Sequence, residues 1–146
     1  MKKIFIIIIF FTNISSLCVA ENFKLEKILD LENPWGSSFI DKDELIITEK
    51  SGKIKLINLF SKEKYKLEHN LDIIENRQGG LLDIIFENNY IYVSYTENRG
   101  EGKTSTSIAR AKYDKNKLNF KNIFQANPPI DSSFHYGSRL VIKGNH

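Results

Sequence analysis

The sequence predicts an all-β protein, because its apolar residues recur in short segments with the spacing of strands. After Glu21, no stretch of convincing length carries the 3.6-residue apolar period of a helix. The apolar segments are rich in Ile, Leu, Phe and Tyr, and Asn, Asp, Gly and Lys interrupt them. Similar segments also recur along the chain, which indicates repeated units.

The first 20 residues are predicted to be a secretory signal peptide. Lys2 and Lys3 precede an unbroken apolar run over Ile4–Phe11, which is too short to span a bilayer comfortably. Small residues follow, and their spacing predicts cleavage after Ala20. Because this pattern suits a bacterial Sec signal, we expect residues 21–146 to be periplasmic or secreted, with no membrane span once the signal is removed.

Cysteine content and charge limit what the exported part can do. The single cysteine, Cys18, lies in the predicted signal; a lipid anchor there is the alternative, although Leu17 stands where such signals place a small residue. Disulfides, cysteine metal sites and thiol catalysis are therefore excluded from residues 21–146. Removing the signal lowers the formal net charge from +3 to +1 and leaves no basic cluster that would predict nucleic-acid binding.

Eight segments are predicted to be strands, from their apolar content and β-favouring side chains. They are Phe23–Leu29, Trp35–Ile40, Glu44–Glu49, Lys53–Asn58, Gly80–Phe86, Tyr90–Tyr95, Ser105–Tyr113 and Phe134–Ile142. Residues that favour tight turns lie between several of them, at Asp41–Asp43, Ser51-Gly52 and Asn88-Asn89. Glu97–Lys103 is predicted to be a polar loop, and Pro128-Pro129 a linker between units.

An internal repeat points to a specific architecture. The segment Trp35–Ile40 (WGSSFI) resembles Tyr136–Val141 (YGSRLV), and Gly79–Ile84 (GGLLDI) is a looser copy. The glycines aligned in the three copies are Gly36, Gly80 and Gly137. They lie 44 and 57 residues apart, and this spacing, with about four short strands per unit, matches a β-propeller blade.

We therefore expect a β-propeller in which each glycine begins the innermost strand of a blade. Near a central channel backbones approach closely, and side chains have little room. A two-sheet β-sandwich with chance similarity between strands is the alternative. Residues 21–146 supply about two blades and the start of a third, whereas closing a propeller takes at least four. The chain is thus expected to be the N-terminal, truncated part of a propeller domain with an open edge.

Two polar residues precede the aligned glycines of adjacent copies. The imidazole of His135 can take a proton from a hydroxyl, although many such histidines simply lie in surface turns. The amide of Gln78 both donates and accepts, which suits a ligand rich in carbonyls and carboxylates, although loop polarity explains it equally well. Since equivalent rims of a propeller converge on one axis, we expect both residues at a single site.

The other residues considered near these positions are assigned different roles. Pro34 and Trp35 occupy the corresponding place in the first copy, where an aromatic ring packs rather than reacts. Asp83 either faces inward or bonds the backbone of a neighbouring blade, and the second, structural role is favoured. No His-x-His pair or carboxylate cluster predicts a metal site.

These residues carry a resemblance to a known family. Residues 33–36 with 45–54, residues 77–84 with 91–95, and residues 135–140 resemble, in the same order, three motifs of the soluble glucose/sorbosone dehydrogenases that depend on pyrroloquinoline quinone (PQQ). The resemblance covers nearly all of residues 21–146. One departure is Tyr136, where the family motif has phenylalanine.

The resemblance implies a six-bladed propeller with PQQ over the central channel and calcium bound to the quinone. It implies oxidation of an aldose at its anomeric carbon, with hydride passing to PQQ. His135 would be the general base and contact the cofactor, and Gln78 would hydrogen-bond the quinone. The family's calcium ligands and other quinone contacts lie beyond residue 146, so we expect this chain to be inactive by itself.

A non-catalytic propeller that binds sugar or a protein partner is the alternative function, and a gene-model truncation is compatible with either. The sequence leaves open which sugar is oxidised, which molecule accepts the electrons and whether the protein oligomerises.

Overall fold

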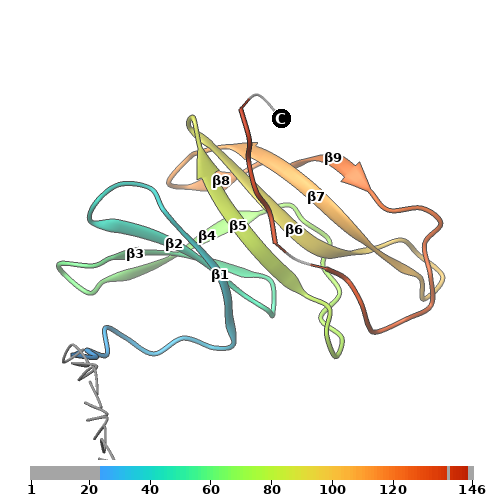
Figure 1. The fold of residues 1–146 in the computed structure, drawn as a ribbon, viewed down its shortest axis with the longest axis horizontal. Coiled ribbons are helices and arrows are strands. Elements are labelled where there is room, and N and C mark those ends of the chain that lie inside the picture. Colours follow the sequence, from blue (N-terminus) through green and yellow to red (C-terminus); the bar gives the residue numbers. More distant parts are fainter. Residues whose placement is uncertain (1–23, 138, 145–146) are drawn as a thin grey trace, which may run out of the picture.

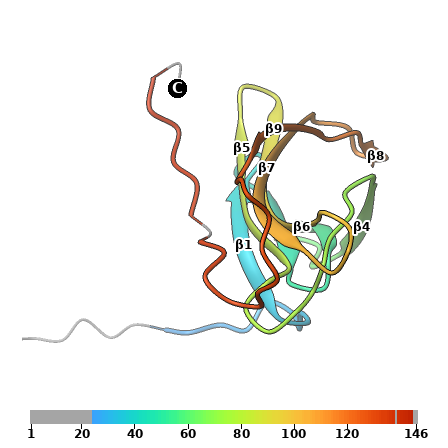
Figure 2. The same cartoon turned by 90° about the vertical axis from the view of Figure 1, so that its right-hand side faces the viewer.

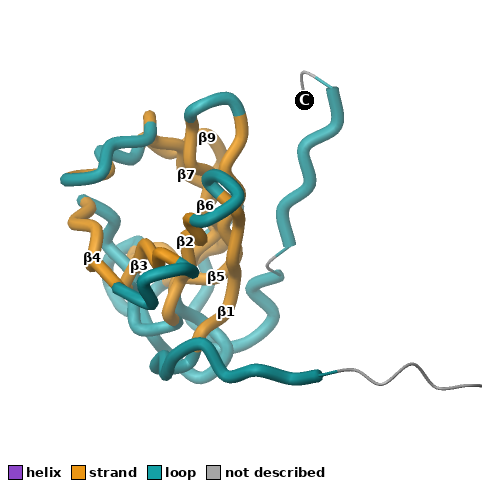
Figure 3. The backbone as a smooth tube through the Cα atoms, turned by 90° about the vertical axis from the view of Figure 1, so that its left-hand side faces the viewer, coloured by secondary structure: helices purple, strands orange, loops and turns teal. Residues whose placement is uncertain are grey.

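The structure is a computed structural model that describes residues 24–137 and 139–144, which form two β-sheets (Figure 1). The predicted signal peptide lies outside the described residues. Among those residues there is no helix with the length and apolar character needed to cross a membrane. Strands and loops account for the whole described chain (Figure 3).

Each sheet is built largely from strands that follow one another in sequence. The first consists of β1 (Pro34–Phe39), β2 (Glu44–Glu49), β3 (Lys53–Asn58) and β4 (Lys64–His69), with β8 (Lys117–Leu118) added in parallel beside β4. The second consists of β5 (Leu81–Glu87), β6 (Tyr90–Asn98), β7 (Thr104–Lys112) and β9 (Lys121–Gln125). Two successive meanders are the arrangement expected of adjacent propeller blades.

The hydrophobic core lies between the two sheets. Ile46 and Ile54 from the first sheet and Ile84 and Val93 from the second belong to one cluster of fully buried side chains. The innermost strands β1 and β5 lie side by side, and Figure 2 shows both sheets extending away from this line. Burial of these aliphatic side chains is the main force that holds the sheets together.

The predicted turns are confirmed at the tips of the hairpins. Asn88 and Asn89, between β5 and β6, have φ values of 50° and 64°, the left-handed conformation that asparagine tolerates. Gly52, between β2 and β3, has a φ of 95°. The Oδ1 atom of Asp41 accepts hydrogen bonds from the backbone amides of Asp43 and Glu44, as expected of a turn-forming aspartate.

Six of the predicted strands are confirmed with small differences at their ends, but the sequence pattern missed β4, β8 and β9. In β4 the buried position is Leu67, which is 1% exposed, while its neighbours are mostly lysine, glutamate and exposed tyrosine. Such an outer strand buries little apolar surface, so its composition gives a weak signal.

The prediction of a strand at Phe23–Leu29 is wrong over its described part, because residues 24–31 form no strand. The segment runs over the outer face of the first sheet without a backbone ladder. Ile28 and Leu29 line a hollow of about 300 Å³ together with Leu45 and Ile47. Ile28 and Leu29, two of the apolar residues that suggested a strand, therefore lie against a sheet rather than join one.

The prediction of a strand at Phe134–Ile142 is also wrong, because residues 134–137 and 139–142 form no strand. In the two sheets, each innermost strand pairs with the strand that follows it in sequence. The described residues after 142 offer no such partner, so the segment attaches through side chains. Figures 2 and 3 show it as a loop that runs beside the sheets and belongs to neither.

Strand register corrects the predicted alignment of the first two copies. Pro34 lies opposite Glu49, and Leu81 lies opposite Tyr95 in the second sheet. The Gly36 amide donates to Thr48 Oγ1, just as the Asp83 amide donates to Ser94 Oγ. Gly36 therefore corresponds to Asp83, and Gly80, with a φ of 150°, precedes β5 rather than lying within it.

Candidate functional site

Gln78 and His135, the two residues predicted to share a site, are hydrogen-bonded to each other. The backbone amide of His135 donates to Gln78 Oε1 at 3.0 Å, across 57 positions of sequence. A second bond runs the other way, since the backbone amide of Gln78 donates to the carbonyl oxygen of Ser133 at 3.2 Å. The side chain of Asn76 adds a bond to Ser133 Oγ at 2.6 Å. The loop before β5 and the loop that carries His135 are thus joined.

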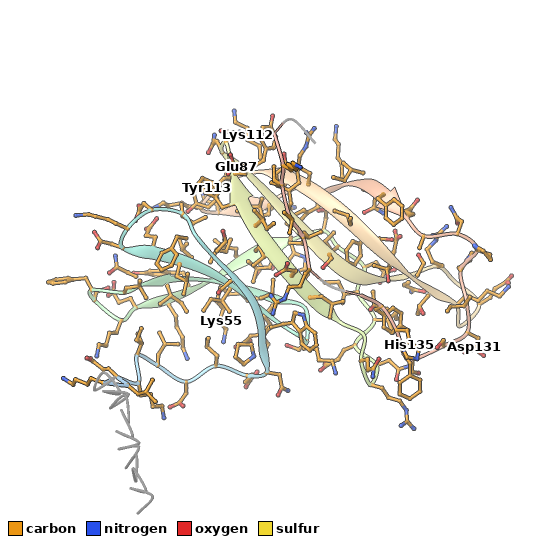
Figure 4. The ribbon with its side chains drawn as sticks, in the orientation of Figure 1. Lys55, Glu87, Lys112, Tyr113, Asp131 and His135 are labelled. Carbon is orange, nitrogen blue, oxygen red and sulfur yellow. The ribbon has the colours of Figure 1, made fainter. Side chains whose placement is uncertain are left out.

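His135 lies exposed on the long connection after β9, near Asp131 (Figure 4). Its φ of 65° is left-handed, which is uncommon for a residue with a side chain. The imidazole is tilted against the ring of Phe134, with 6.4 Å between centroids. Within the described part of the chain, neither ring nitrogen has a hydrogen-bond partner, so both can meet a ligand.

Tyr136 anchors this connection, a role that the sequence pattern did not reveal. Its side chain is 5% exposed, and its hydroxyl lies 2.9 Å from Thr104 Oγ1 and donates to the Ser132 carbonyl oxygen. Its own carbonyl accepts a bond of 2.5 Å from Thr106 Oγ1. A Cβ at Gly79 would come within 2.9 Å of the tyrosine ring. Gly79 therefore leaves the space that this ring fills.

Arg77 adds a positive charge beside the two joined loops. Its guanidinium carbon lies 5.5 Å from the centroid of the Phe134 ring, a cation–π distance. The backbone of Arg77 is left-handed, with a φ of 43°, and its carbonyl accepts a hydrogen bond from Lys50 Nζ. The cation and the aromatic ring are both on the surface, next to Gln78.

The structural role favoured for Asp83 is confirmed. Its Oδ2 accepts a hydrogen bond of 2.7 Å from the backbone amide of Leu140, and its Oδ1 pairs with Arg139 at 3.1 Å. Asp83 is 5% exposed, whereas the side chain of Arg139 is 72% exposed. The buried carboxylate ties the segment after the His135 loop to the second sheet. The described residues contain no group of three or more His, Cys, Asp or Glu placed to hold a metal ion.

Comparison with known proteins places this arrangement in a family. The family model described as Glucose / Sorbosone dehydrogenase matches residues 31–146. An uncharacterized protein of Synechocystis, slr1608, is 27% identical over 125 residues, which cover 76% of this chain and 30% of that protein.

Solved structures agree with the sequence comparison. The soluble aldose sugar dehydrogenase of Escherichia coli, in its apo form, is 26% identical and superposes with a TM-score of 0.70 over 77% of this chain and 35% of that one. The PQQ-bound aldose sugar dehydrogenase of Streptomyces coelicolor is 20% identical, with a TM-score of 0.64 over 75% of this chain and 34% of that one. The likeness confirms the β-propeller type of fold over part of the chain.

The chain spans about a third of the length of these relatives. The matched region includes both Gln78 and His135, which the fold brings into contact. This chain belongs to the glucose/sorbosone dehydrogenase family.

Proposed function

We propose that residues 21–146 are the N-terminal part of an exported quinoprotein that oxidises aldose sugars at the anomeric carbon, with PQQ and calcium as cofactors. The observation that carries the proposal is the hydrogen bond between His135 and Gln78, which joins two family motifs at one exposed site. The calcium ligands, the electron acceptor and the remaining cofactor contacts are assigned to a longer protein.

The donors at this site suit a quinone with carbonyl and carboxylate groups. Because Gln78 Oε1 accepts from His135, the side-chain NH₂ of Gln78 points its donors elsewhere, and in the described chain it has no partner. The guanidinium of Arg77 supplies a nearby positive charge. Gln78 would hold the cofactor, and His135 would contact it. When bound, PQQ supplies the acceptor for two electrons carried as hydride.

His135 would act as the general base. A neutral imidazole nitrogen accepts the proton of the anomeric hydroxyl as the adjacent C–H bond breaks. Removing that proton while hydride leaves avoids a high-energy cation. The backbone of His135 is held by Gln78, while its ring has no hydrogen bond to any other described residue. A fixed backbone with an available ring is what a positioned base requires.

The first test is the nucleotide sequence of the gene beyond the codon for His146. Continuation through further blades makes the enzyme testable by adding PQQ, calcium and an aldose and following dye reduction. In that protein, His135→Asn is expected to lower kcat about 10²–10⁴-fold, the usual contribution of a general base. His69→Asn, at a histidine that bonds the Gly52 carbonyl in the first sheet, is the matched control and is expected to leave kcat unchanged.

Two outcomes would reject the proposal. One is a His135→Asn enzyme that reduces dye at the rate of the unaltered protein. The other is a full-length protein that binds no PQQ by calorimetry in the presence of calcium. The second result would favour a non-catalytic propeller that binds sugar or a protein partner, which sugar titration and affinity capture would then examine.

A further inference from the structure

His135 is held on both sides by side chains from the second repeat. On its N-terminal side, its amide donates to Gln78 Oε1 at 3.0 Å. On its C-terminal side, Tyr136 is fixed by its hydroxyl to Thr104 and Ser132 and by its carbonyl oxygen to Thr106. The exposed residue is thus held through its own amide and through the residue that follows it.

These anchors explain how His135 keeps its backbone conformation. A non-glycine residue in the left-handed region persists only where its surroundings hold it there. His135 is exposed, so packing of its own side chain does not supply that restraint. The hydrogen bonds to its amide and to the next residue remain as the cause.

The hydroxyl of Tyr136 matters for the hydrogen bonds that it makes rather than for the space that it fills. A phenylalanine at this position would fill the same space against Gly79, but it would bond neither Thr104 Oγ1 nor the Ser132 carbonyl. The bond to Ser132 closes the short loop 132–136 on itself, and the contact with Thr104 attaches that loop to β7. Losing the hydroxyl would loosen the loop next to His135, while the core packing and the bond from Thr106 to the Tyr136 carbonyl stay in place.

We propose that Tyr136 and Gln78 form a two-point clamp that sets the position of His135, and that Tyr136 is a positioning residue. The side-chain oxygen Oε1 of Gln78 is the second point of the clamp, which leaves the side-chain NH₂ group for a ligand. The catalytic meaning of the clamp rests on the proposed function, but its existence is a property of this chain's own hydrogen bonds.

Amide hydrogen exchange, followed by NMR on the full chain without cofactor, tests the clamp directly. Tyr136→Phe and Gln78→Met are each expected to raise the exchange rate of the His135 amide at least about tenfold, because each removes one point of the clamp. Gln78→Glu retains an acceptor oxygen but lacks the NH₂ group, so it is expected to leave that rate within about twofold of the unaltered chain.

Tyr95→Phe is the matched control. Tyr95 is also buried in the second sheet, and its hydroxyl bonds Asn122 Oδ1 at 2.7 Å, away from the His135 loop. It is expected to lower stability without changing exchange at His135. The proposal is overturned if Tyr136→Phe leaves the His135 amide as protected as before, or if Tyr95→Phe exposes it equally.

The two proposals fail in different ways. Exchange is measured without PQQ, so a chain that lacks quinone chemistry would still show the clamp. If the clamp is absent but dye reduction requires His135, the proposed function stands and the positioning role of Tyr136 falls. In the active protein, Tyr136→Phe is expected to lower kcat while KM changes less, because a misplaced base affects the transition state more than sugar binding.

Discussion

The hydroxyl of Thr48 joins the two sheets, because it donates to the carbonyl oxygen of Leu82 at 2.5 Å. Thr48 Oγ1 also accepts a hydrogen bond of 2.9 Å from the Gly36 backbone amide, and Thr48 is fully buried. One side chain on β2 therefore satisfies polar groups on the innermost strands of both sheets.

Thr48→Val is expected to destabilise the chain by about 1–3 kcal/mol, because the valine has the same shape but leaves buried backbone groups of Gly36 and Leu82 without their partner. Urea unfolding followed by circular dichroism measures the change. Thr48→Ser retains the hydroxyl and is expected to lose less stability than Thr48→Val. Equal unfolding midpoints for the valine variant and the unaltered chain would contradict the role given to this bond.

Gly36→Ala is expected to destabilise the chain by about 1–3 kcal/mol through steric overlap. A Cβ at this position would lie 2.9 Å from Asp83 Cα and from the Ile84 amide nitrogen, and these are backbone atoms with little room to move. The thermal unfolding midpoint reports the effect. Ser37→Ala, at the next and exposed position, is the control and should shift the midpoint little. A stabilised Gly36→Ala variant would show that the sheets separate more easily than the contact implies.

Releasing Asp83 from the C-terminal segment should expose that segment to protease. In Asp83→Ala the Leu140 amide and Arg139 lose their acceptor, so tryptic cleavage after Arg139 and Lys143 is expected to accelerate about tenfold or more. Most of this effect is assigned to the Leu140 bond, since exposed ion pairs contribute little. Asp131→Ala is the control, and mass spectrometry locates the cuts. Cleavage at the same rate in both variants would remove Asp83 as the anchor.

Lys55→Met is expected to lower the free energy of unfolding by about 3–5 kcal/mol, because it leaves the buried Glu49 carboxylate without its charge partner. Glu49 is fully buried, the side chain of Lys55 is 14% exposed, and their charged atoms lie 2.7 Å apart. Glu49 Oε1 also accepts from the Glu32 amide, whereas Oε2 has no hydrogen-bond partner among the described residues. The double variant Glu49→Gln, Lys55→Met is expected to recover part of the loss in urea unfolding. If the stability losses of the two single variants simply add in the double variant, Glu49 and Lys55 do not interact.

Stability should fall in acid because of Glu97. Burial raises the pKa of this carboxyl, but hydrogen bonds from Ser107, Gln125 and Asn122 outweigh burial and hold the pKa below the ordinary value of 4.5. A depressed pKa in the folded state contributes stability that is present above pH 4.5 and is lost as the pH falls through the folded value.

Glu97→Gln removes this titration, so the stability difference between the variant and the unaltered chain should narrow as the pH falls below about 4.5. Urea unfolding at a series of pH values measures it. Glu101→Gln, at an exposed loop position, is the control. A constant difference between pH 7 and pH 3 would contradict a linkage through Glu97.

The local sequence pattern was sufficient to predict the inner strands and the turns. The strands β2 and β3 have the predicted limits, because alternating or continuous Ile and Leu report burial on a sheet. The asparagine pair at 88–89 and Gly52 mark turns whose backbone conformations few other residues adopt.

The pattern failed where a strand depends on its partner rather than on its own composition. The apolar residues at 134–137 and 139–142 read like an inner strand, but no described strand pairs with them. Conversely, β4 is a strand despite its lysines, because the edge of β3 offers it a ladder and Leu67 reaches the core. Backbone pairing is a property of two segments, so one segment cannot determine it.

At the candidate site, too, some features could be predicted from the sequence and others depended on tertiary contacts. By itself the sequence determined the all-β repeat and the family resemblance, and it singled out Gln78 and His135 as candidate site residues. Only the tertiary structure decided that Gln78 holds the backbone of His135, that Tyr136 anchors the loop through its hydroxyl, and that Gly36 corresponds to Asp83. Composition reports which side chains are buried or reactive, whereas register and contacts between distant loops arise when the two sheets pack together.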